Sequence, residues 1–592
     1  MLKRSFLLAW LAVWACGGCA GRLGVADLVI VDARVWTGAG GEAAAVAVRG
    51  ERIVAVGSDW QVRRWIGDET EVVEAGGRRV IPGITDSHIH IVGGGLQLGR
   101  LNLRDVTSRD EFVEKVAAAV QAMRDETRGS DRWMLGGRWS VESWDAPSPP
   151  RKEWIDAVTP ETPVFLERMD GHQGLANSVA LRRAGIDREG PADPAGGVIE
   201  RDAKTGEPTG ILKDAAMDLV TDLVPPPSED DLYTALLLAM AHGNSLGITS
   251  MHDVSGREDL AAMFRAHREG ALTVRIRKFL SVPNWIDVID VVKGFEVNDA
   301  WLCVGGFKGY MDGSLGSRTA YMYRPYADSG APNNYPSGIL SEMASPPKEL
   351  RYMMEQADAA GLQCAVHAIG DEANHILLDA YAAVARKNGP RDRRHRIEHA
   401  QHLFPEDVPR FAELGVVASM QPLHKADDGR YAEGALGKGR LAGSYAFRSL
   451  MDSGALVAFG SDWPVVSCDP FKGMAAAVTA QTLDGKIWIR EESITIEEAL
   501  QAYTVNPAMA GHGESQLGTI EVGKLADMVI LSQDILHVNP ERIADTQAVM
   551  TIVGGKIVFD RLRGDEPDTG PKNQIFLQMP RRESHIVSSP DY

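Results

Sequence analysis

Short apolar segments alternate with amphipathic helical segments through the middle of this chain, and this alternation constrains its fold most. Strands that alternate with helices form a parallel sheet, because each helix returns the chain to the same end of the sheet. Eight such strands close into an α/β barrel of the (β/α)8, TIM-like type. The predicted strands are 80–90, 247–252, 273–279, 302–308, 362–367, 394–399, 416–420 and 456–462, and helices are predicted at 230–244, 347–360, 372–387, 405–414 and 447–453.

Both ends of the chain have a different sequence pattern, in which runs of β-branched residues alternate with glycine-rich turns. Strands are predicted near 26–36, 43–48, 52–56, 72–80, 523–534 and 548–560. The simplest arrangement is one small β-sandwich built from both termini. The expected domains are the composite β-sandwich (25–80 and 511–562), the barrel (81–510, with an insertion at about 96–242) and a polar C-terminal tail (563–592).

Composition agrees with a soluble globular protein. The 592 residues are 44% apolar and 24% charged, which is ordinary for a globular protein. The net charge of −19, without basic blocks, argues against nucleic acid or anionic lipid as a partner.

The N-terminus has the pattern of an export signal. Lys3 and Arg4 precede an apolar run at 6–15 and the small residues that contain Cys16 and Cys19. We expect residues 1–19 to direct the protein to the bacterial periplasm or cell envelope. A lipid anchor on Cys19 or Cys16 is predicted, and a plain secretory signal is the alternative.

Side chains suited to metal binding fall at the ends of several predicted strands, the catalytic end of such barrels. His88 and His90 share one face of a strand, because strand side chains alternate with a period of two. Such imidazole, carboxylate and amine groups suit one or two divalent ions, zinc first. The predicted ligands are His88, His90, Lys308, His367, His399 and Asp462.

Each residue has an ordinary explanation when taken alone. Asp462 could cap a helix, His367 could be a core histidine, and Lys308 could be an ion-paired surface lysine. Their joint appearance at one end of the barrel favours the metal site. Glu398 should face away from His399 if the strand is regular, so a structural role is predicted for it.

The order of the motifs resembles the amidohydrolase superfamily, and within it the amidohydrolase-3 or YtcJ-like group related to N-substituted formamide deformylases. The resemblance covers residues from about 26 to 560. It rests on 82–90, 170–172, 177–178, 307–320, 367–371, 396–401, 460–464 and 523–527.

This resemblance implies two divalent ions bridged by a carbamylated lysine, the place held here by Lys308. The strand-one histidines would bind one ion and the later histidines the other. A partly desolvated lysine beside cations should have a lowered pKa, which supplies the neutral amine that carbamylation requires. An unmodified Lys308 would repel metal and could bind a substrate carboxylate instead.

The predicted reaction is hydrolysis of a C–N bond in an amide, an N-substituted formamide or a cyclic amide. Metal-activated hydroxide attacks, and Asp462 is placed to act as general base and then acid. A deaminase or esterase-like activity on the same site stays open, as does a non-catalytic surface lipoprotein with a degenerate barrel. The expected partner is a small amide-type molecule, and the oligomeric state is open, a homo-oligomer included.

The long insertion is the predicted source of substrate contacts. Its tryptophans, Trp139 among them, either line a pocket over the barrel mouth or pack the insertion's own core. By resemblance, His172 is the leading candidate for a substrate contact. Asp312 and Arg318 on the strand-four loop are further candidates, with bracing of the loop as the alternative role.

Overall fold

The computed structural model describes residues 24–126, 133–142, 144, 148–281, 285–294, 297–328 and 335–564. The predicted signal, with Cys16 and Cys19, lies outside these residues, as does the tail from 565 onward. In the described part of the chain, no helix is long and apolar enough to cross a membrane.

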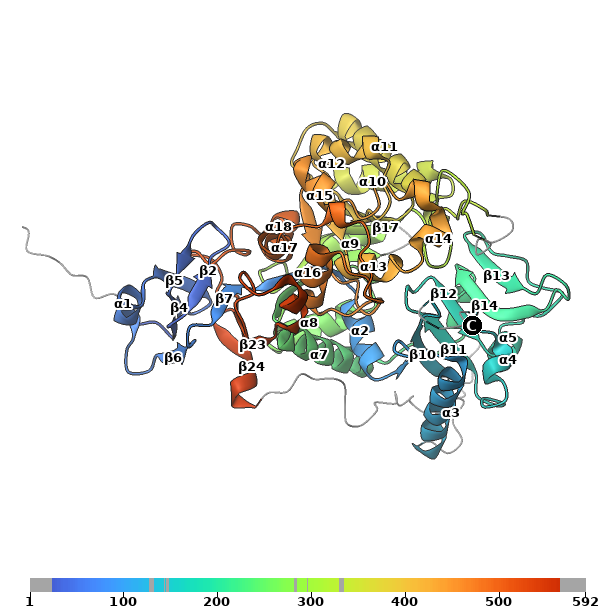
Figure 1. Cartoon of the computed structure of the whole chain (residues 1–592), viewed down its shortest axis with the longest axis horizontal. Helices are drawn as coiled ribbons and strands as arrows, with labels where there is room; N and C mark the ends of the chain where they lie inside the picture. The colour runs from blue at the N-terminus through green and yellow to red at the C-terminus, as the bar shows by residue number, and fades with distance from the viewer. Residues whose placement is uncertain are drawn as a thin grey trace, which may run out of the picture.

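Eight parallel strands form the central barrel (Figure 1), which confirms the predicted fold class and its eight strands. The barrel closes through the loop after the last strand, where the Asp462 N–H donates to the His88 carbonyl (2.7 Å). The strands are β8 (Ile84–Ile89), β15 (Ile248–Asp253), β16 (Arg275–Ser281), β17 (Leu302–Tyr310), β18 (Gln363–Ala368), β19 (Arg396–His399), β20 (Val417–Met420) and β21 (Val457–Phe459).

Amphipathic helices cover the barrel, as their apolar spacing predicts. Helix α7 begins with a capping box in which Ser228 and Asp231 satisfy each other's backbone N–H groups. The buried strands and the inner helix faces form one continuous apolar core. The covering helices include α7 (Glu229–Ser245), α10 (Pro347–Ala359), α11 (Asp371–Asn388), α12 (Val408–Leu414) and α15 (Phe447–Asp452).

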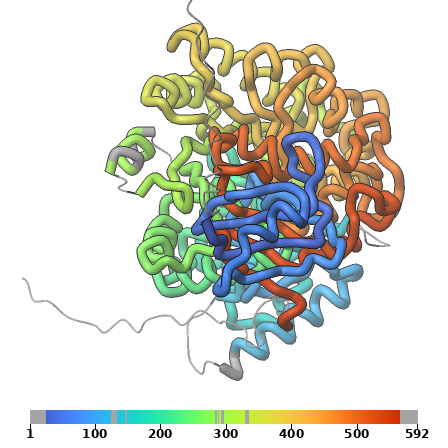
Figure 2. Tube along the Cα trace, turned by 90° about the vertical axis from the view of Figure 1, so that its left-hand side faces the viewer, coloured from blue at the N-terminus to red at the C-terminus, as the bar shows by residue number. Residues whose placement is uncertain are grey.

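The two termini build the β-sandwich together. Strand β22 (Met528–Leu531) pairs antiparallel with β7 (Arg79–Pro82), so segments 450 residues apart share a sheet. Figure 2 shows these blue and red segments side by side on the face toward the viewer. The buried Arg79 donates to Asp534 (2.8 Å) and anchors the shared sheet. Strand β7 then runs directly into the first barrel strand, which places His88 close to this junction.

The strands of the sandwich form two sheets. One has the order β5-β4-β1-β6 and the other the order β24-β23-β22-β7-β2-β3. Their bounds are β1 (Leu28–Val31), β2 (Arg34–Trp36), β3 (Glu42–Ala43), β4 (Ala45–Arg49), β5 (Arg52–Gly57), β6 (Glu71–Glu74), β23 (Ala548–Val553) and β24 (Lys556–Asp560).

The insertion after β8 contains a six-stranded sheet of its own (Figure 1). After α2 (Ile91–Leu98), the chain forms a mixed sheet in the order β13-β14-β12-β11-β10-β9. Its elements are β9 (Leu101–Asn102), α3 (Arg109–Glu126), β10 (Met134–Trp139), α4 (Lys152–Ile155), β11 (Val164–Arg168), β12 (Gln173–Ala176), α5 (Ser178–Arg183), β13 (Gly197–Arg201) and β14 (Pro208–Asp214).

Candidate metal centre

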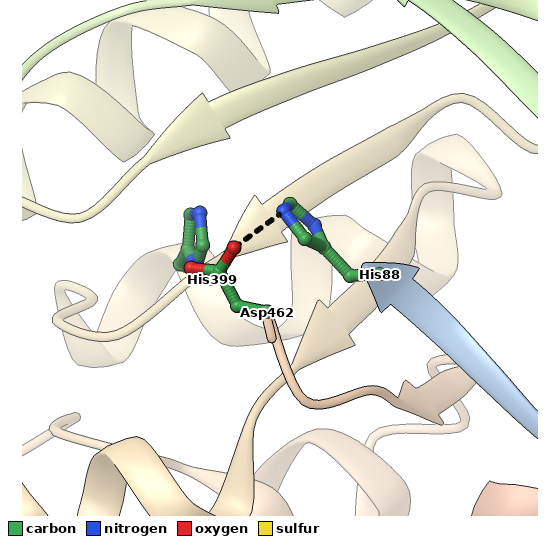
Figure 3. A group of neighbouring side chains, drawn as sticks. All are labelled: His88, His399 and Asp462. Atoms are coloured by element: carbon green, nitrogen blue, oxygen red, sulfur yellow. Dashed lines mark ion pairs between the residues drawn. The ribbon is translucent and has the colours of Figure 1, made fainter. Parts of the chain in front are cut away.

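Three metal-binding side chains meet at the carboxyl ends of the barrel strands. His88 lies near the end of β8, His399 ends β19, and Asp462 lies in the loop after β21. One ligand atom from each lies within 4.8 Å of the others, and all three residues are buried (Figure 3). The His88 Nε2 lies 3.4 Å from the Asp462 Oδ1. Three of the predicted ligands are therefore brought together.

Left-handed backbone at two of these residues aims their side chains into the site. His399 has φ 76° and Asp462 has φ 59°, a region that non-glycine residues rarely adopt. Such strain costs about 1–3 kcal/mol and persists where the surrounding packing enforces it. Here the left-handed backbone occurs at the end of β19 and in the loop after β21, at the two residues whose side chains must point into the barrel mouth.

Glu398 corrects the expectation that it faces away from the site. Its buried carboxylate lies 2.5 Å from the His88 Nδ1, because the left-handed His399 breaks the strand's alternation and both neighbours serve the same cluster. Burial alone would raise the pKa of Glu398, but the charge of Arg396 and the hydrogen bond from His88 hold it well below its ordinary value. The predicted structural role takes the form of positioning His88.

The Glu398 contact fixes the tautomer of His88. With Glu398 ionised, the His88 Nδ1 donates its proton, so the Nε2 carries the lone pair. That Nε2 is buried and has no hydrogen-bond partner. A buried imidazole lone pair beside a carboxylate fits a borderline divalent ion such as zinc. Together with His399 and Asp462, the donor set fits a metal of this kind.

His399 and His90, two other predicted ligands, also have one ring nitrogen held by a neighbouring side chain. The His399 Nδ1 donates to the Gln421 Oε1 (2.8 Å), which leaves its Nε2 with the lone pair. The His90 Nε2 lies 3.2 Å from the Asp462 Oδ1, and its Nδ1 lies 3.2 Å from the Ser255 hydroxyl. Both histidines therefore have a nitrogen available at the cluster.

His367 and Lys308 border the same space. The His367 ring centroid lies 4.5 Å from that of His399, and its Nε2 donates to the Gly313 carbonyl (3.0 Å). Its Nδ1 is therefore the nitrogen with the lone pair. Lys308 is buried, and burial lowers the pKa of its amine to about 8, only partly offset by the charges of Glu398 and Asp462. This pKa gives an appreciable neutral amine fraction near neutral pH.

His424 is a site residue that the sequence reasoning missed. It lies in α13 (Pro422–Asp428), its Nε2 is buried without a hydrogen-bond partner, and that atom lies 3.7 Å from the Asp462 Oδ2. Its ring stacks parallel to that of His399 at 5.8 Å. The available signal was its place just after the predicted strand at 416–420, at the catalytic end of the barrel.

The cluster opens into a cavity of about 380 Å³ that the insertion helps to line. His172 lies on its wall, and the His172 ring is 5.3 Å from that of His367. The His172 Nδ1 is 2.6 Å from the Asp214 Oδ1. His172 is therefore positioned beside the cluster, as a substrate contact would have to be.

The prediction that Trp139 contacts the substrate is wrong. It is 1% exposed, its Nε1 donates to the Leu166 carbonyl (2.8 Å), and it packs in the insertion's own apolar core. Apolar burial with a satisfied N–H is the usual role of a tryptophan.

Arg318 and Asp312 lie outside the lining of the catalytic cavity. Arg318 pairs with Asp328 (2.6 Å) and donates to the carbonyls of its own loop, so it braces that loop. Asp312 is buried and accepts backbone N–H groups, including that of Gly370 (2.8 Å). Both residues take the structural alternative, because their polar atoms are already used within the fold.

Residues 71–559 match the amidohydrolase family. The chain belongs to this family. Its shared region spans the barrel, the insertion and both halves of the β-sandwich. Membership, together with the buried His and Asp cluster, supports metal-dependent hydrolytic chemistry.

Several relatives extend over nearly the whole chain. Protein LONG AFTER FAR-RED 3 of Arabidopsis thaliana is 39% identical, covering 90% of this chain and 92% of its own. The putative amidohydrolase YtcJ of Bacillus subtilis is 32% identical, covering 83% of this chain and 91% of its own, which agrees with the predicted YtcJ-like group. The N-substituted formamide deformylase of Arthrobacter pascens is 28% identical (90% and 98%).

A solved structure of a metal-dependent hydrolase shares the architecture. An uncharacterised metal-dependent hydrolase from Pyrococcus horikoshii superposes with a TM-score of 0.68 at 25% identity, covering 87% of this chain and 99% of its own. The barrel with its accessory sheets is thus a known arrangement for a metal-dependent hydrolase.

Proposed function

We propose that this protein hydrolyses the C–N bond of an amide, an N-substituted formamide or a cyclic amide. The observation that carries the proposal is the buried cluster of His88, His399 and Asp462. The His88 Nε2 in this cluster has no hydrogen-bond partner. The relative named as an N-substituted formamide deformylase supports the choice of C–N bond. The N-terminal sequence favours export to the bacterial periplasm or cell envelope, with a lipid anchor at Cys19 or Cys16.

The proposed centre holds two divalent ions, zinc first. His88, His90, His367, His399 and Asp462 are the proposed ligands, and Lys308, carbamylated by carbon dioxide, is the proposed bridge. When bound, such ions polarise a carbonyl and make water acidic enough to ionise near neutral pH. The lowered pKa of Lys308, about 8, supports carbamylation, because only the neutral amine attacks carbon dioxide.

The chain's own residues then move protons and hold the substrate. Asp462 is ionised, because its contacts with His88 and His90 outweigh burial and hold its pKa well below the ordinary value. It would accept the proton of the attacking water and pass it to the leaving nitrogen. Glu398 keeps His88 in the tautomer that binds metal.

His172 would donate a hydrogen bond to the substrate oxygen as negative charge develops there. Burial lowers its pKa, but the hydrogen bond to Asp214 and the charges of Asp214, Asp170 and Asp312 outweigh burial and raise it to about 9. His172 is therefore an imidazolium at neutral pH. Donors aimed at a developing oxyanion are worth about 10²–10³ in turnover.

We expect kcat/KM to fall as the pH rises through about 9, because His172 then loses its second proton. The protonated form is the active one, so activity is full below this pKa and lost above it. His172→Gln should lower kcat/KM about 10²-fold and remove this alkaline limb. His267→Gln, on a histidine paired with Asp299 far from the cavity, is the matched control and should keep the limb. An unchanged limb in His172→Gln would assign it to another group.

Metal content and substrate turnover test the proposed function directly. Purified protein should contain one to two divalent ions per chain and hydrolyse at least one member of a panel of formamides, N-acyl amino acids, cyclic amides, esters and aminopurines. Chelation should abolish the activity, and zinc or manganese should restore it. Turnover of esters or aminopurines alone would favour the esterase-like or deaminase alternative. Less than one ion per chain and no turnover would refute an enzyme.

A further inference from the structure

Two arginines at the start of the insertion face the catalytic cavity. Arg100 follows α2 and Arg138 lies in β10, and both line the space that also contains His88 and Asp462. The charges that act on Arg100 are those of Glu167 and Arg138, which have opposite signs. Glu167 therefore acts on both guanidinium groups, and its Oε2 lies 3.8 Å from the Arg138 Nη2.

The backbone of β10 is built to present Arg138. The strand has a bulge between Gly137 and Trp139, and Arg138 itself has φ 63°. A Cβ on Gly136 would come within 2.3 Å of the Leu101 carbonyl oxygen, and one on Gly137 within 2.2 Å of the Glu167 carbonyl oxygen. The two glycines are thus required for the close packing that turns the next side chain out of the sheet and toward the cavity. Strained positions of this kind are concentrated at functional sites.

Arg138 has unused hydrogen-bonding capacity. Its side chain is 11% exposed, its Nε is buried without a partner, and its Nη2 lies 3.8 Å from the Glu167 Oε2, beyond hydrogen-bond length. Burial lowers the pKa of Arg138, and the charges of Glu167, Asp462 and Asp170 do not offset it. A buried guanidinium is costly unless an anion pairs with it.

Building on the proposed hydrolase function, we propose that Arg138, assisted by Arg100, binds a carboxylate of the substrate. A carboxylate in the cavity would pair with two N–H groups of the Arg138 guanidinium, the bidentate geometry that guanidinium groups favour. The substrate class is then an amide that carries a carboxylate away from the scissile C–N bond, as in an N-acyl amino acid.

Charge on the same wall favours a monoanion. Glu167 and Asp170 also line the cavity. These carboxylates would repel a phosphate dianion more strongly than a single carboxylate, so the arginines on this wall favour the monoanion. A neutral ligand would leave the Arg138 Nε unpaired in a buried position, which costs binding free energy.

The test compares N-formyl-leucine with N-formyl-leucinamide, which replaces the carboxylate with a neutral amide of the same shape. Arg138→Gln should raise KM for N-formyl-leucine about 10- to 100-fold with kcat nearly unchanged, since it removes a charge-assisted pair. For N-formyl-leucinamide, kcat/KM should change less than about threefold. Arg138→Lys keeps the charge but loses the planar guanidinium that pairs bidentately with a carboxylate. Its KM for N-formyl-leucine should fall between those of wild type and Arg138→Gln.

Arg182→Gln, on an exposed arginine of α5 in the same insertion, is the matched control and should leave both substrates unaffected. Equal losses on both substrates in Arg138→Gln would overturn the carboxylate site. If neither substrate is hydrolysed, calorimetric binding of N-formyl-leucine to wild type and Arg138→Gln decides separately. Binding that depends on Arg138 would support the site while the proposed function fails, and binding that does not would overturn it.

Discussion

Asp462→Asn is expected to reduce turnover about 10³-fold while the protein keeps its metal. Asparagine preserves the shape and one oxygen of the side chain but cannot accept a proton, and general acid–base groups contribute about 10²–10⁴ in rate. The proposed histidine ligands, with His88 held by Glu398, should still bind metal. Metal analysis and kcat on the same preparations measure the two effects independently.

Asp230→Asn is the matched control, because Asp230 is an exposed carboxylate of α7 that pairs only with Arg265 at the surface. It should change neither metal content nor kcat. If Asp462→Asn loses metal and turnover together, Asp462 is primarily a structural ligand, and proton transfer must be assigned to another group. His424, whose unpartnered Nε2 lies 3.7 Å from Asp462, is then the first candidate.

The barrel and the place of its site could be predicted because both follow from local patterns. Apolar runs such as Cys364–Val366 and Val416–Ala418 are typical of strands buried on both faces, and the structure confirms strands there. Parallel strands in a barrel bring their carboxyl ends to one rim. His88 and His399, more than 300 residues apart in sequence, meet there for this reason.

Backbone departures from regular strand geometry account for what the sequence did not reveal. Glu398 and His399 serve the same cluster because His399 is left-handed, and β-strand periodicity predicts the opposite. Arg138 reaches the cavity through a bulge, which no apolar pattern marks. His424 belongs to a helix that follows its strand, so a search confined to strand ends passes over it.

The tryptophans of the insertion illustrate a choice that required tertiary structure. Trp139 and Trp144 both satisfy their indole N–H groups with backbone carbonyls and pack in the insertion's core. Sequence alone leaves both a pocket lining and a small core open, because both require apolar aromatic side chains. The six-stranded sheet decides for the core, since it provides the apolar surface that these rings cover.

Lys308→Ala is expected to reduce turnover on the order of 10³-fold, and a short carboxylic acid should restore part of it. Carbamylation forms a bond between the Lys308 nitrogen and the carbon of carbon dioxide, releases a proton and leaves an anionic carboxylate. If Lys308 is carbamylated as proposed, the alanine variant lacks this anion but leaves room for one, so acetate or propionate would serve as the metal ligand in its place. Activity measured against acid concentration should rise and saturate.

Lys425→Ala is the control that separates this effect from the general loss of a buried lysine. Burial also lowers the pKa of Lys425 to about 8, but its Nζ donates to the Ile489 carbonyl (3.0 Å) and it does not line the catalytic cavity. Activity of Lys425→Ala should not respond to acetate or propionate. Failure of these acids to restore Lys308→Ala, with its metal still bound, would contradict the carbamate bridge. Lys308 would then be an unmodified amine, and the carboxylate of N-formyl-leucine should bind Lys308→Ala more weakly than wild type.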